Sequence, residues 1–516
     1  MNPEFQAVDV DYAAIAPILV VAAGALVGVV VEAFAPRRHR HGIQVWLTTL
    51  TLAGAFAALV AWSSQSHTVT LGGSVVIDGV SVFLMGALLL LSVISVLIMA
   101  ERFGGVGADA FTPMGASTPG SSQEDAATRA GYATSEVFPL TLFAVLGMMV
   151  FLTANDLITM FVGLEVLSLP LYVMTGLARR RRLLSQEAAL KYFLLGAFSS
   201  AFFLFGSALL FGYAGSSDLS AISRAISTAS GDLEGLLVPG VVLVLVGLLF
   251  KVGAVPFHSW TPDAYQGAPT PVTGFMAACT KLAAFGVILR VTFVAVGANR
   301  WDWQDGVYVI AVLTMVVGAV LSVTQTDVKR LLAYSSIAHA GFILVGVLAF
   351  SQAAIGGVMF YLVAYGFATI AAFGIIAMVR QGGSEASHLS QWAGLGRRHP
   401  VVAGAFSFLL LAFAGIPLTS GFTAKFAAFA PAVEAGPGGA VLVLIAVLAS
   451  AVTAFVYVRL IVLMYFTDAT GDEVVALTPS VPSTIGITVG VLATVVLGIV
   501  PGFALDLASS ASEFLL

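Results

Sequence analysis

The stretch "VLVLVGLLFKVGAVPFHSWTPDAYQGAPTPV" (residues 242–272) combines two features that normally exclude each other. Nine apolar or small residues lead into Lys251, as in a helix that crosses a bilayer, and Pro256 follows five residues later. A charged side chain at the bilayer centre costs about 2.5–3.5 kcal/mol on insertion scales, and proline disrupts a helix interior. A segment that holds both indicates a membrane helix that is interrupted at a polar point inside the protein.

The composition of the whole chain agrees with a membrane location. The 516 residues are 59% hydrophobic and 9% charged, with a mean hydropathy of +1.01, whereas soluble domains carry about 25% charged residues. Apolar runs near the ~20 residues that a spanning helix needs recur along the chain. The ~10-residue alternating segments of a membrane barrel do not occur. We therefore expect an all-α polytopic membrane protein.

Several kinds of site are excluded by residue type and motif. The single cysteine, Cys279, cannot form an intrachain disulfide, a Cys-ligated iron–sulfur cluster or a Cys-based zinc site, and we interpret it as a packing residue. The sequence contains no P-loop, no HExxH motif and no carboxylate cluster suited to a metal. We expect no cofactor and no redox centre in this chain. The acidic N-terminus lacks the basic region of a signal peptide, so the first apolar run is expected to remain as a span.

The apolar runs predict fourteen spans, with boundaries uncertain by a few residues. They cover residues 13–35, 43–62, 79–100, 136–152, 156–178, 187–213, 238–258, 271–296, 306–324, 328–350, 354–379, 400–431 (long and interrupted), 438–466 and 482–505.

The basic residues predict how these spans are oriented. With both termini on the outer side, most of the 22 lysines and arginines fall in cytoplasmic loops, and only Arg224 and Arg300 fall in outer loops. This asymmetry is the positive-inside rule. The cytoplasmic set comprises Arg37, Arg38, Arg40, Arg102, Arg129, Arg179, Arg180, Arg181, Arg182, Lys329, Arg330, Arg380, Arg397 and Arg398.

A weak internal repeat organises the central spans. "YFLLGAFSSAFFLFG" (192–206) aligns with "FYLVAYGFATIAAFG" (360–374), and "KLAAFGVILR" (281–290) aligns with "SAVTAFVYVR" (450–459), at nearly the same offset. Both pairs fall in corresponding spans if spans 4–8 and 9–13 are two five-helix units, and an odd number of helices inverts the second unit. Chance similarity between apolar segments is the alternative.

The chain accordingly divides into five expected regions. They are three N-terminal helices (1–103), a flexible cytoplasmic loop rich in Gly, Ser, Thr and Ala (104–135), a first five-helix repeat (136–296), a second and inverted repeat (305–466), and a C-terminal helix (467–516).

Ionisable residues lie deep inside five different spans. They are Glu165, Lys251, Lys281, His339 and Lys425. At 1.5 Å per residue Glu165 is ~14 Å deep, near the middle of a ~30 Å hydrocarbon core, and the others have similar depths. Residues of this kind usually mark a functional path. We therefore predict a polar line that runs parallel to the membrane.

Two further residues belong to the predicted path with less support. Lys191 is only four residues into its span and is expected to extend towards the surface. His258 lies at the cytoplasmic end of span 7, where it would serve an entry path. For His339, a proton relay and a hydrogen-bonded structural histidine both remain open.

Helix breaks occur at corresponding positions of the two repeats. Pro256 follows Lys251 in span 7, while Gly415, Pro417 and Gly421 precede Lys425 in span 12. Broken helices free backbone groups that cannot face lipid, and such breaks in both repeats point to a transport path. A kinked packing helix, with its lysine paired to Glu165, is the alternative at either site.

Proton transfer is the chemistry that these residues permit. Burial disfavours the charged form of a lysine and a nearby carboxylate favours it, so the ionisation of Glu165 would decide whether Lys251 keeps its proton. Polar neighbours are expected to hold water or to join helices. They are Ser168, Thr175, Ser199, Ser200, Thr273, Thr280, Tyr334, Ser335, Ser336, Tyr361 and Tyr365.

Three motifs resemble a known family. "KVGAVPFHSWTPDAYQGAPTPVTGF" (251–275), "TDVKRLLAYSSIAHAGF" (326–342) and "GIPLTSGFTAKF" (415–426) are similar to the antiporter-like membrane subunits of respiratory complex I, the proton-pumping NADH:quinone oxidoreductase. The resemblance extends over the whole chain. A lysine at position 425 and the end of the chain soon after span 14 favour one paralogue over those with a glutamate there or a long lateral helix.

The resemblance implies a module of the bacterial cell membrane that translocates protons and is driven by quinone reduction in neighbouring subunits. It places the family's key residues on Glu165, Lys251, Lys281 and Lys425, and a further family lysine on Lys191. It implies membrane and peripheral subunits of complex I as partners, including adjacent antiporter-like subunits, within the lipid bilayer and without nucleic acid. NADH, FMN, iron–sulfur clusters and quinone would lie in other subunits.

Two alternatives from other classes remain. One is a subunit of a multisubunit Na⁺/H⁺ antiporter, whose large subunits share these motifs. The other is a structural spacer of the membrane arm that moves no protons, which the set of buried charges disfavours.

Overall fold

The computed structural model of the chain describes residues 10–63, 67–103, 109–130, 134–228, 234–381, 384–468 and 474–515. Its helices are α1 (Tyr12–Phe34), α2 (Arg37–Trp62), η1 (Leu71–Gly73), α3 (Gly79–Met99), α4 (Ser122–Arg129), α5 (Val137–Thr153), α6 (Leu157–Thr175), α7 (Arg182–Ala214), α8 (Leu219–Thr228), α9 (Glu234–Val252), α10 (Trp260–Gly267), α11 (Thr270–Phe275), η2 (Met276–Thr280), α12 (Lys281–Arg290), η3 (Val291–Ala295), α13 (Arg300–Val323), α14 (Val328–Leu348), α15 (Gln352–Met378), η4 (Leu389–Trp392), α16 (Leu395–Arg398), α17 (Pro400–Ala414), α18 (Ser420–Glu434), α19 (Pro437–Phe466), α20 (Val481–Ile499) and α21 (Gly502–Ser510).

Strands are short and lie at the ends of the helices. They are β1 (Thr68–Thr70), β2 (Val75–Ile77), β3 (Val379–Gln381), β4 (Ser384–Glu385) and β5 (Val474–Ala476). β1 and β2 pair antiparallel, with Thr68 opposite Ile77. β3 is the central strand of an antiparallel sheet in the order β4-β3-β5.

The fold class is confirmed as an all-α membrane protein. Among the described residues, twelve helical segments are long and apolar enough to cross a bilayer, and α5 and α17 are shorter apolar helices. A helix lies in each of the fourteen predicted ranges. The number of crossings and the inverted repeat remain predictions.

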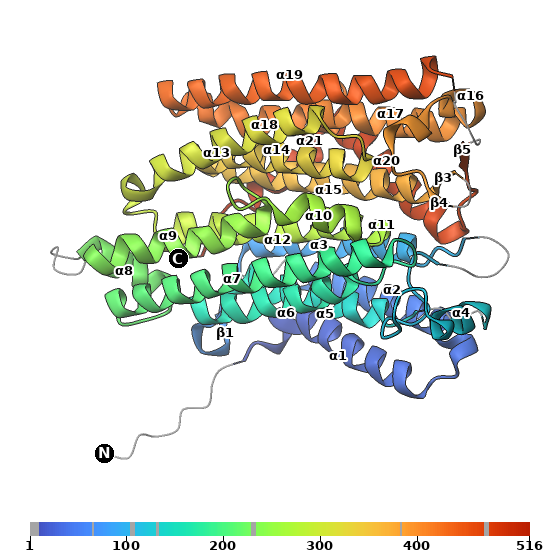
Figure 1. Cartoon of the computed structure of the whole chain (residues 1–516). Helices are drawn as coiled ribbons and strands as arrows, with labels where there is room; N and C mark the ends of the chain where they lie inside the picture. Colours follow the sequence, from blue (N-terminus) through green and yellow to red (C-terminus); the bar gives the residue numbers. More distant parts are fainter. Residues whose placement is uncertain are drawn as a thin grey trace.

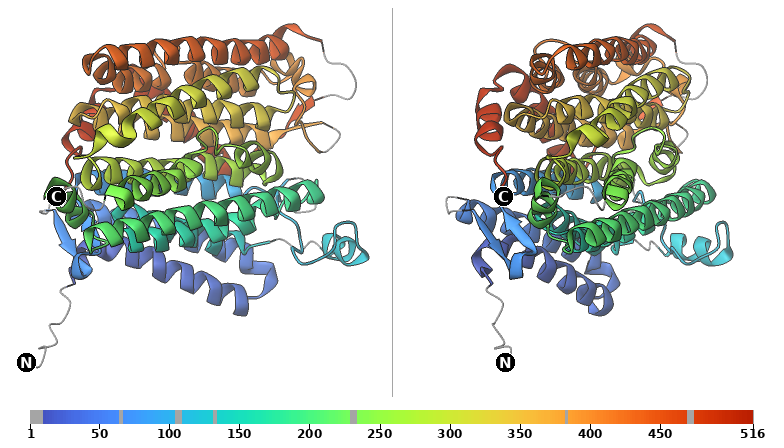
Figure 2. Two further views of the ribbon diagram at one scale, coloured as in Figure 1. Left: turned by 60° about the vertical axis from the view of Figure 1, so that its left-hand side comes forward. Right: turned by 90° about the vertical axis from the view of Figure 1, so that its left-hand side faces the viewer.

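The long helices lie side by side, with the N-terminal helices at one flank and α17 and α19 at the other (Figure 1). The turned views in Figure 2 keep this order, from blue through green to red. The penultimate helix, α20, returns from the second flank to pack on α3 and α15.

The middle of the molecule is formed by the helices that carry the predicted polar residues. In the apolar 18-residue stretch of the helical segment Thr270–Ala295, 100% of the residues are buried, and in that of α14 the share is 94%. The corresponding share is 39% or less in α1, α2, α19 and α20. Cys279 is fully buried in this core and its sulfur contacts the Ser92 hydroxyl, which confirms the interpretation as a packing residue. The outer helices expose leucine, valine and phenylalanine, as lipid contact requires.

Close helix packing depends on glycine where two backbones approach each other. A Cβ on Gly147 of α5 would lie 2.2 Å from the Leu167 nitrogen of α6, and one on Gly163 of α6 would lie 2.7 Å from the Phe151 nitrogen of α5. Small residues at such crossings allow van der Waals contact between the backbones of membrane helices. The α5–α6 pair therefore holds Glu165 of α6 against the rest of the first half of the molecule.

The two predicted helix breaks are present, and the helices that precede them, α9 and α17, end in the same way. The chain after α9 turns at Gly253 (φ +74°), and the chain after α17 turns at Gly415 (φ +81°). In each case two backbone N–H groups return to the last turn, Gly253 to Phe250 and Ala254 to Leu249 in one, and Gly415 to Ala412 and Ile416 to Leu411 in the other. This is the Schellman arrangement that glycine favours. Helix α9 ends four residues before Pro256, so the glycine and not the proline sets its end.

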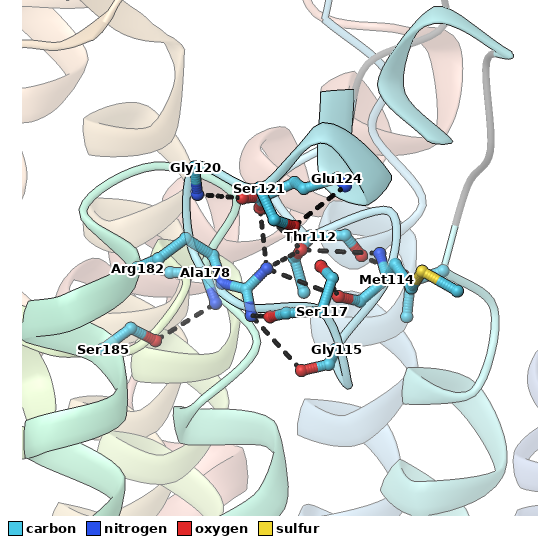
Figure 3. A network of polar contacts seen from close by, with 11 residues as sticks. Thr112, Met114, Gly115, Ser117, Gly120, Ser121, Glu124, Ala178, Arg182 and Ser185 are labelled. Atoms are coloured by element: carbon cyan, nitrogen blue, oxygen red, sulfur yellow. Dashed lines mark hydrogen bonds and ion pairs between the residues drawn. The ribbon is translucent and has the colours of Figure 1, made fainter. Parts of the chain in front are cut away.

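Part of the loop expected over residues 104–135 is folded, which differs from the prediction of a flexible loop. Residues 109–130 carry α4, whose first turn is capped by the Ser121 hydroxyl. The buried Arg182 at the start of α7 binds Glu124 over 2.7 Å and Thr112 over 2.6 Å (Figure 3). The guanidinium also donates to the carbonyl oxygens of Met114, Gly115 and Ser117. The segment is thus held by the polar contacts of Arg182 together with Phe111, which is buried in the main hydrophobic core.

Candidate functional site

Lys251 lies at the C-terminal end of α9, directly before the break. Its side chain is buried, and its Nζ lies 5.5 Å from the ring centroids of both Tyr172 and Tyr192. Its ammonium makes no hydrogen bond to any of the described residues. The lysine is therefore held by two aromatic faces and by the partial negative charge of the helix end, and its proton is not committed to an acceptor.

Glu165 lies on α6 and precedes Lys251 in the predicted polar line. Its Oε1 atom is buried and has no hydrogen-bond partner among the described residues. No ion pair within 4.0 Å joins it to Lys251 in the described part of the chain. The alternative of a lysine paired to Glu165 is therefore not what the structure contains. No direct contact therefore joins the two groups in the described part of the chain.

A small cavity connects Lys251 with Lys281. Its volume is ≈ 10 Å³, and both lysines line it together with Tyr192, Trp260, Tyr265 and other residues. The hydroxyls of Thr261 and Thr280 also line it, and neither has a hydrogen-bond partner among the described residues. A cavity of this size with several polar partners meets the requirements for one buried water.

Lys281 begins α12, immediately after the π-helical turn η2. Its Nζ donates to the Ser336 carbonyl over 2.5 Å and to the Ser336 hydroxyl over 2.6 Å. Its charge also lies 5.2 Å from the Tyr365 ring centroid. The π-helical turn displaces one residue from the normal helical register, and such turns occur often at functional sites. Lys281 therefore bridges from the first half of the molecule to α14 in the second.

His339 is one helical turn further along α14 than Ser336. Its Nδ1 is 2.7 Å from the Tyr361 hydroxyl, while its Nε2 is buried without a partner among the described residues. A cavity of ≈ 10 Å³ is lined by His339, Tyr365, Phe413 and Gly421 among others. One ring nitrogen is thus fixed by tyrosine and the other is available to a water, which is compatible with both interpretations of this histidine.

Lys425 lies on α18, after the second break. Its Nζ donates to the carbonyl oxygens of Phe413 (3.0 Å) and Ala414 (2.8 Å), and to the Ser450 hydroxyl (2.7 Å). The two carbonyls belong to the end of α17, where helical acceptors are unsatisfied. The break therefore supplies two ligands for the buried ammonium group.

The structure connects Lys251, Lys281, His339 and Lys425 in one series, and Glu165 lies on the same face of α6 as Tyr172, whose ring is beside Lys251. We call these five residues the central polar line. They come from α6, α9, α12, α14 and α18, so each lies on a different helix. Neighbouring members are related by tyrosine rings, serine hydroxyls and small cavities.

Two predicted residues lie apart from the central polar line. Lys191 is 46% exposed and pairs with Glu187 (2.7 Å) and Asp263 (3.0 Å), as its expected position near the surface required. Asp263 also binds Arg330 over 2.6 Å, so Lys191 belongs to a surface network. His258 is partly exposed in the turn between α9 and α10.

The predicted break residues have separable roles. Gly415 provides the positive φ at the end of α17, and Pro417 lies in the turn that follows. Gly421 allows close packing, because a Cβ there would lie 1.8 Å from the Ala412 carbonyl oxygen. Pro256 follows a cis peptide bond from Val255.

Sequence reasoning missed the aromatic residues around Lys251. Tyr172 lies seven residues after Glu165 on α6, hence on the same helix face, and this spacing could have identified it. Tyr192 stacks on Trp260 with a centroid distance of 4.5 Å. Its position beside Lys251 depends on the packing of α7 against α10, which no local pattern in the sequence contains.

A buried ion pair at one end of α12 was also missed. Arg290 makes two hydrogen bonds of 2.9 Å to Asp78, the residue that caps α3, and both side chains are almost wholly buried. The backbone N–H of Leu515 reaches the same carboxylate over 3.2 Å. The aspartate lay at the edge of a predicted span, so its burial could not be predicted.

Lys329, assigned to a cytoplasmic loop, is also buried. It donates to the Ala268 carbonyl over 2.7 Å and to the Thr270 hydroxyl over 3.2 Å. A polar pocket of ≈ 110 Å³ adjoins it, lined by Asp109, Arg181 and Asp327 among others. The start of the buried helix that carries Lys281 therefore lies next to this polar pocket.

No cluster of three or more His, Cys, Asp or Glu suited to a metal occurs among the described residues.

Comparison with known proteins gives consistent results. The family described as NADH:quinone oxidoreductase/Mrp antiporter, TM matches residues 154–454. A curated relative from Rhodococcus opacus, named NADH-quinone oxidoreductase subunit N, is 55% identical over 98% of this chain and 96% of its own length. One from Streptomyces griseus, named NADH-quinone oxidoreductase subunit N 3, is 52% identical over 99% of this chain and 95% of its own.

Solved structures are similar over nearly the full length. A chain of respiratory complex I from Thermus thermophilus with bound aureothin has a TM-score of 0.76 and 32% identity, covering 96% of this chain and 99% of that one. A chain of the Mrp complex from Dietzia sp. DQ12-45-1b has a TM-score of 0.81 with 21% identity, covering 97% of each chain, and shows likeness of fold.

Proposed function

The chain belongs to the NADH:quinone oxidoreductase/Mrp antiporter membrane family, and from this premise we propose that it moves protons by way of the central polar line. It is a membrane-arm, proton-translocating subunit of NADH:quinone oxidoreductase, whose partners are the other subunits of that complex. The names of its relatives, subunit N, agree with the paralogue that the lysine at position 425 favoured.

The cavity between Lys251 and Lys281 is the observation that carries the proposal. One water there would accept from the Lys251 ammonium and contact the hydroxyls of Thr261 and Thr280. A lysine buried without a fixed acceptor loses its proton more readily than a solvated one, because burial disfavours the charged form. Lys251, whose ammonium has no acceptor among the described residues, is therefore the proposed proton donor to this water.

The state of Glu165 would control this step. When Glu165 is ionised, its charge favours the protonated form of Lys251, and when it is neutral that support is lost. The proton then moves through the water to Lys281 or one of its neighbours. From Lys281 the Ser336 hydroxyl leads to α14, where His339 and Tyr361 continue the path towards Lys425.

The pocket beside Lys329 suits the intake of protons. It is polar, lies next to the start of the buried helix that carries Lys281, and is bordered by the predicted cytoplasmic arginines. The proposed orientation, with both termini on the outer side, places this pocket on the cytoplasmic side. His258, in the first helix break, remains a candidate for an entry route.

The chain takes part in an oxidoreductase complex, and we propose that it contributes proton transfer and no electron transfer. NADH, FMN, iron–sulfur clusters and quinone would then be bound by other subunits. We also propose that residues 136–296 and 305–466 form the two inverted repeats, with residues 1–103 and 467–516 as flanking membrane helices.

The test compares the wild-type complex with Lys251→Ala in proteoliposomes, measuring NADH:quinone turnover and proton pumping, with assembly followed on a native gel. We expect both activities to fall while the complex assembles. Arg224→Ala, at an exposed position on α8, is the control and should keep both. Normal turnover and pumping in Lys251→Ala would refute the proposal, and pumping that depends on Na⁺ would favour the antiporter alternative.

A further inference from the structure

Trp260, the first residue of α10, joins the two sides of the break that follows Lys251. Its side chain is buried, and its indole N–H donates to the Phe250 carbonyl oxygen over 2.9 Å. Phe250 directly precedes Lys251 in the last turn of α9, and its carbonyl also accepts from the Gly253 N–H over 3.0 Å. The indole therefore holds the end of α9 against the beginning of α10.

The same indole supports one of the two rings that face the Lys251 ammonium. It stacks on Tyr192 of α7 with a centroid distance of 4.5 Å and an interplanar angle of 7°. Tyr192 in turn meets Tyr172 edge to face, with a centroid distance of 4.6 Å. The Tyr192 hydroxyl is buried and makes no hydrogen bond to any of the described residues. The position of this ring therefore depends on packing, and the Trp260 indole provides one of the faces that it packs on.

The location of the Lys251 ammonium depends in turn on these rings. Lys425 is held by three hydrogen-bond acceptors, whereas the Lys251 ammonium has none among the described residues. Its Nζ lies 5.5 Å from the ring centroids of both Tyr172 and Tyr192. A cation–π contact requires the cation to lie within about 6 Å of the centroid. A small displacement of the Tyr192 ring would therefore end its contact with the ammonium.

We propose that Trp260 is a positioning residue for proton transfer: it holds the Tyr192 ring, and this ring holds the Lys251 ammonium at the cavity shared with Lys281. Trp260 also lines that cavity, next to Thr261. It does not itself carry the proton, because an indole has a single N–H and no acceptor, and this N–H is bonded to Phe250. The inference rests on the proposed function, since Trp260 acts through Lys251.

Trp303 on α13 provides a matched control for an indole that only packs and caps. Both tryptophan side chains are 4% exposed. The Trp303 indole N–H donates to the Val296 carbonyl, directly after η3, over 3.0 Å. Trp303 lines neither of the two small cavities of the central polar line. Trp303→Leu therefore removes a similar buried contact at a helix end away from Lys251.

The test measures NADH:quinone turnover, proton pumping and thermal stability in assembled complexes that carry Trp260→Leu, Tyr192→Leu, both substitutions together, or Trp303→Leu. We expect Trp260→Leu and Tyr192→Leu each to reduce turnover and pumping about tenfold. Trp303→Leu should lower thermal stability to a similar extent and leave both activities within about twofold of wild type. Normal turnover and pumping in assembled Trp260→Leu would overturn the proposal, and so would an equal loss of activity in Trp303→Leu.

The double variant shows whether Trp260 acts through the Tyr192 ring. If it does, adding Trp260→Leu to Tyr192→Leu should lower turnover by less than about twofold further, because the ring to be positioned is already absent. Independent roles would instead multiply the two losses to about a hundredfold. That outcome would overturn the proposal.

Two conservative variants keep the test decisive if Trp260→Leu fails to assemble. Trp260→Phe keeps an aromatic face for Tyr192 and loses the N–H, while the Phe250 carbonyl retains the Gly253 donor. Tyr192→Phe keeps the ring and removes only a hydroxyl without a partner among the described residues. Both variants should retain most of the wild-type turnover and pumping. A tenfold loss in either, in assembled complex, would overturn the proposal, as would full activity in Tyr192→Leu.

Failure of this inference can be told apart from failure of the proposed function. Normal pumping in Lys251→Ala would refute the proposed function itself. Loss of pumping in Lys251→Ala, together with normal pumping in Trp260→Leu, would overturn only the role of Trp260.

Discussion

Lys425 donates a hydrogen bond of 2.8 Å to the carbonyl oxygen of Ala414, the last residue of α17. Lys251 has a related position, because it lies in the last turn of α9. In both halves of the molecule a lysine therefore meets the C-terminal end of a broken helix, where unsatisfied carbonyls carry partial negative charge. The two differ in that Lys425 has three acceptors and the Lys251 ammonium has none among the described residues.

This difference predicts contrasting effects of the same substitution. Lys251→Met should abolish proton pumping with little change in thermal stability, since no hydrogen bond is lost and methionine fills similar space between Tyr172 and Tyr192. Lys425→Met should abolish pumping and also destabilise, because the Phe413 carbonyl loses the Lys425 donor, while Ala414 keeps the Ser450 hydroxyl, and a buried carbonyl left unsatisfied costs about 1–3 kcal/mol. Pumping assays and thermal unfolding of the purified complex test both. Equal loss of stability in the two variants would contradict the contrast.

The threonines of the first cavity should affect proton transfer through a bound water. Thr261→Val and Thr280→Val preserve shape and remove the hydroxyls, so we expect turnover to fall roughly tenfold when both are changed, equivalent to about 1.4 kcal/mol in the barrier. Thr484→Val, at an exposed position on α20, is the matched control and should not change turnover. Steady-state NADH oxidation coupled to pH-dye quenching measures the effect. An unchanged rate in the double variant would show that a water in this cavity is not part of the proton path.

Gly415→Ala should weaken the second break. The positive φ strains any side chain there by about 1–2 kcal/mol, and the added Cβ would lie 3.0 Å from both Nζ and Cδ of Lys425. We expect reduced turnover in assembled complex, because the lysine must move away from its carbonyl acceptors. Gly438→Ala introduces the same methyl group where nothing lies within 4 Å and should behave as wild type.

Asp78 and Arg290 should stabilise the fold as a pair, whereas either charge without its partner should destabilise it. Asp78→Asn or Arg290→Met leaves one buried charge without its partner, which typically costs about 3–5 kcal/mol. The double variant Asp78→Asn with Arg290→Met removes both charges and should recover much of that loss. A double-mutant cycle on thermal stability measures the coupling. Additive losses would show that the two charges act independently.

The folded segment 109–130 should loosen at acidic pH. Burial opposes ionisation of Glu124, but the Gly120 N–H and the Arg182 guanidinium outweigh it and hold the pKa of the carboxyl below its ordinary value of 4.5. A carboxyl of lowered pKa stabilises the fold above its ordinary pKa, and this stabilisation is lost as the pH falls through the folded value. Hydrogen exchange of residues 109–130, corrected for intrinsic rates, should rise over that range.

Arg182→Ala should produce the same loosening at neutral pH, because the guanidinium binds Glu124, Thr112 and three carbonyl oxygens of the segment. Arg224→Ala is the surface control. Exchange in this segment that stays slow in Arg182→Ala would mean that other contacts hold it, and the pH effect would then have another origin.

The sequence predicted the elements that depend on composition and on rare residues. Lipid requires long apolar helices, so each span produced a visible run of hydrophobic residues. A lysine or glutamate inside such a run is rare enough to be informative, and Glu165, Lys251, Lys281 and Lys425 were identified for this reason. Both helix breaks were expected because glycine and proline accompany the lysines.

The sequence could not predict contacts that depend on three-dimensional packing. Tyr192 reaches Lys251 from another helix, and Ser336 reaches Lys281 from the second half of the chain. The burial of Lys329 was not predicted because the residue lies near a span boundary, where a shift of a few residues decides between water and protein. The folded part of the 104–135 segment was missed because residues outside it, among them Arg179 and Arg182, supply its polar contacts.

The burial of Cys279 has a practical consequence for experiments on this protein. It is the only thiol in the chain, and its side chain is fully buried beside Ser92. A membrane-impermeant maleimide should therefore not react with the native protein. Cysteines introduced one at a time at the helix ends would be labelled against no background, and their labelling from one side of sealed vesicles would report the orientation of every span directly.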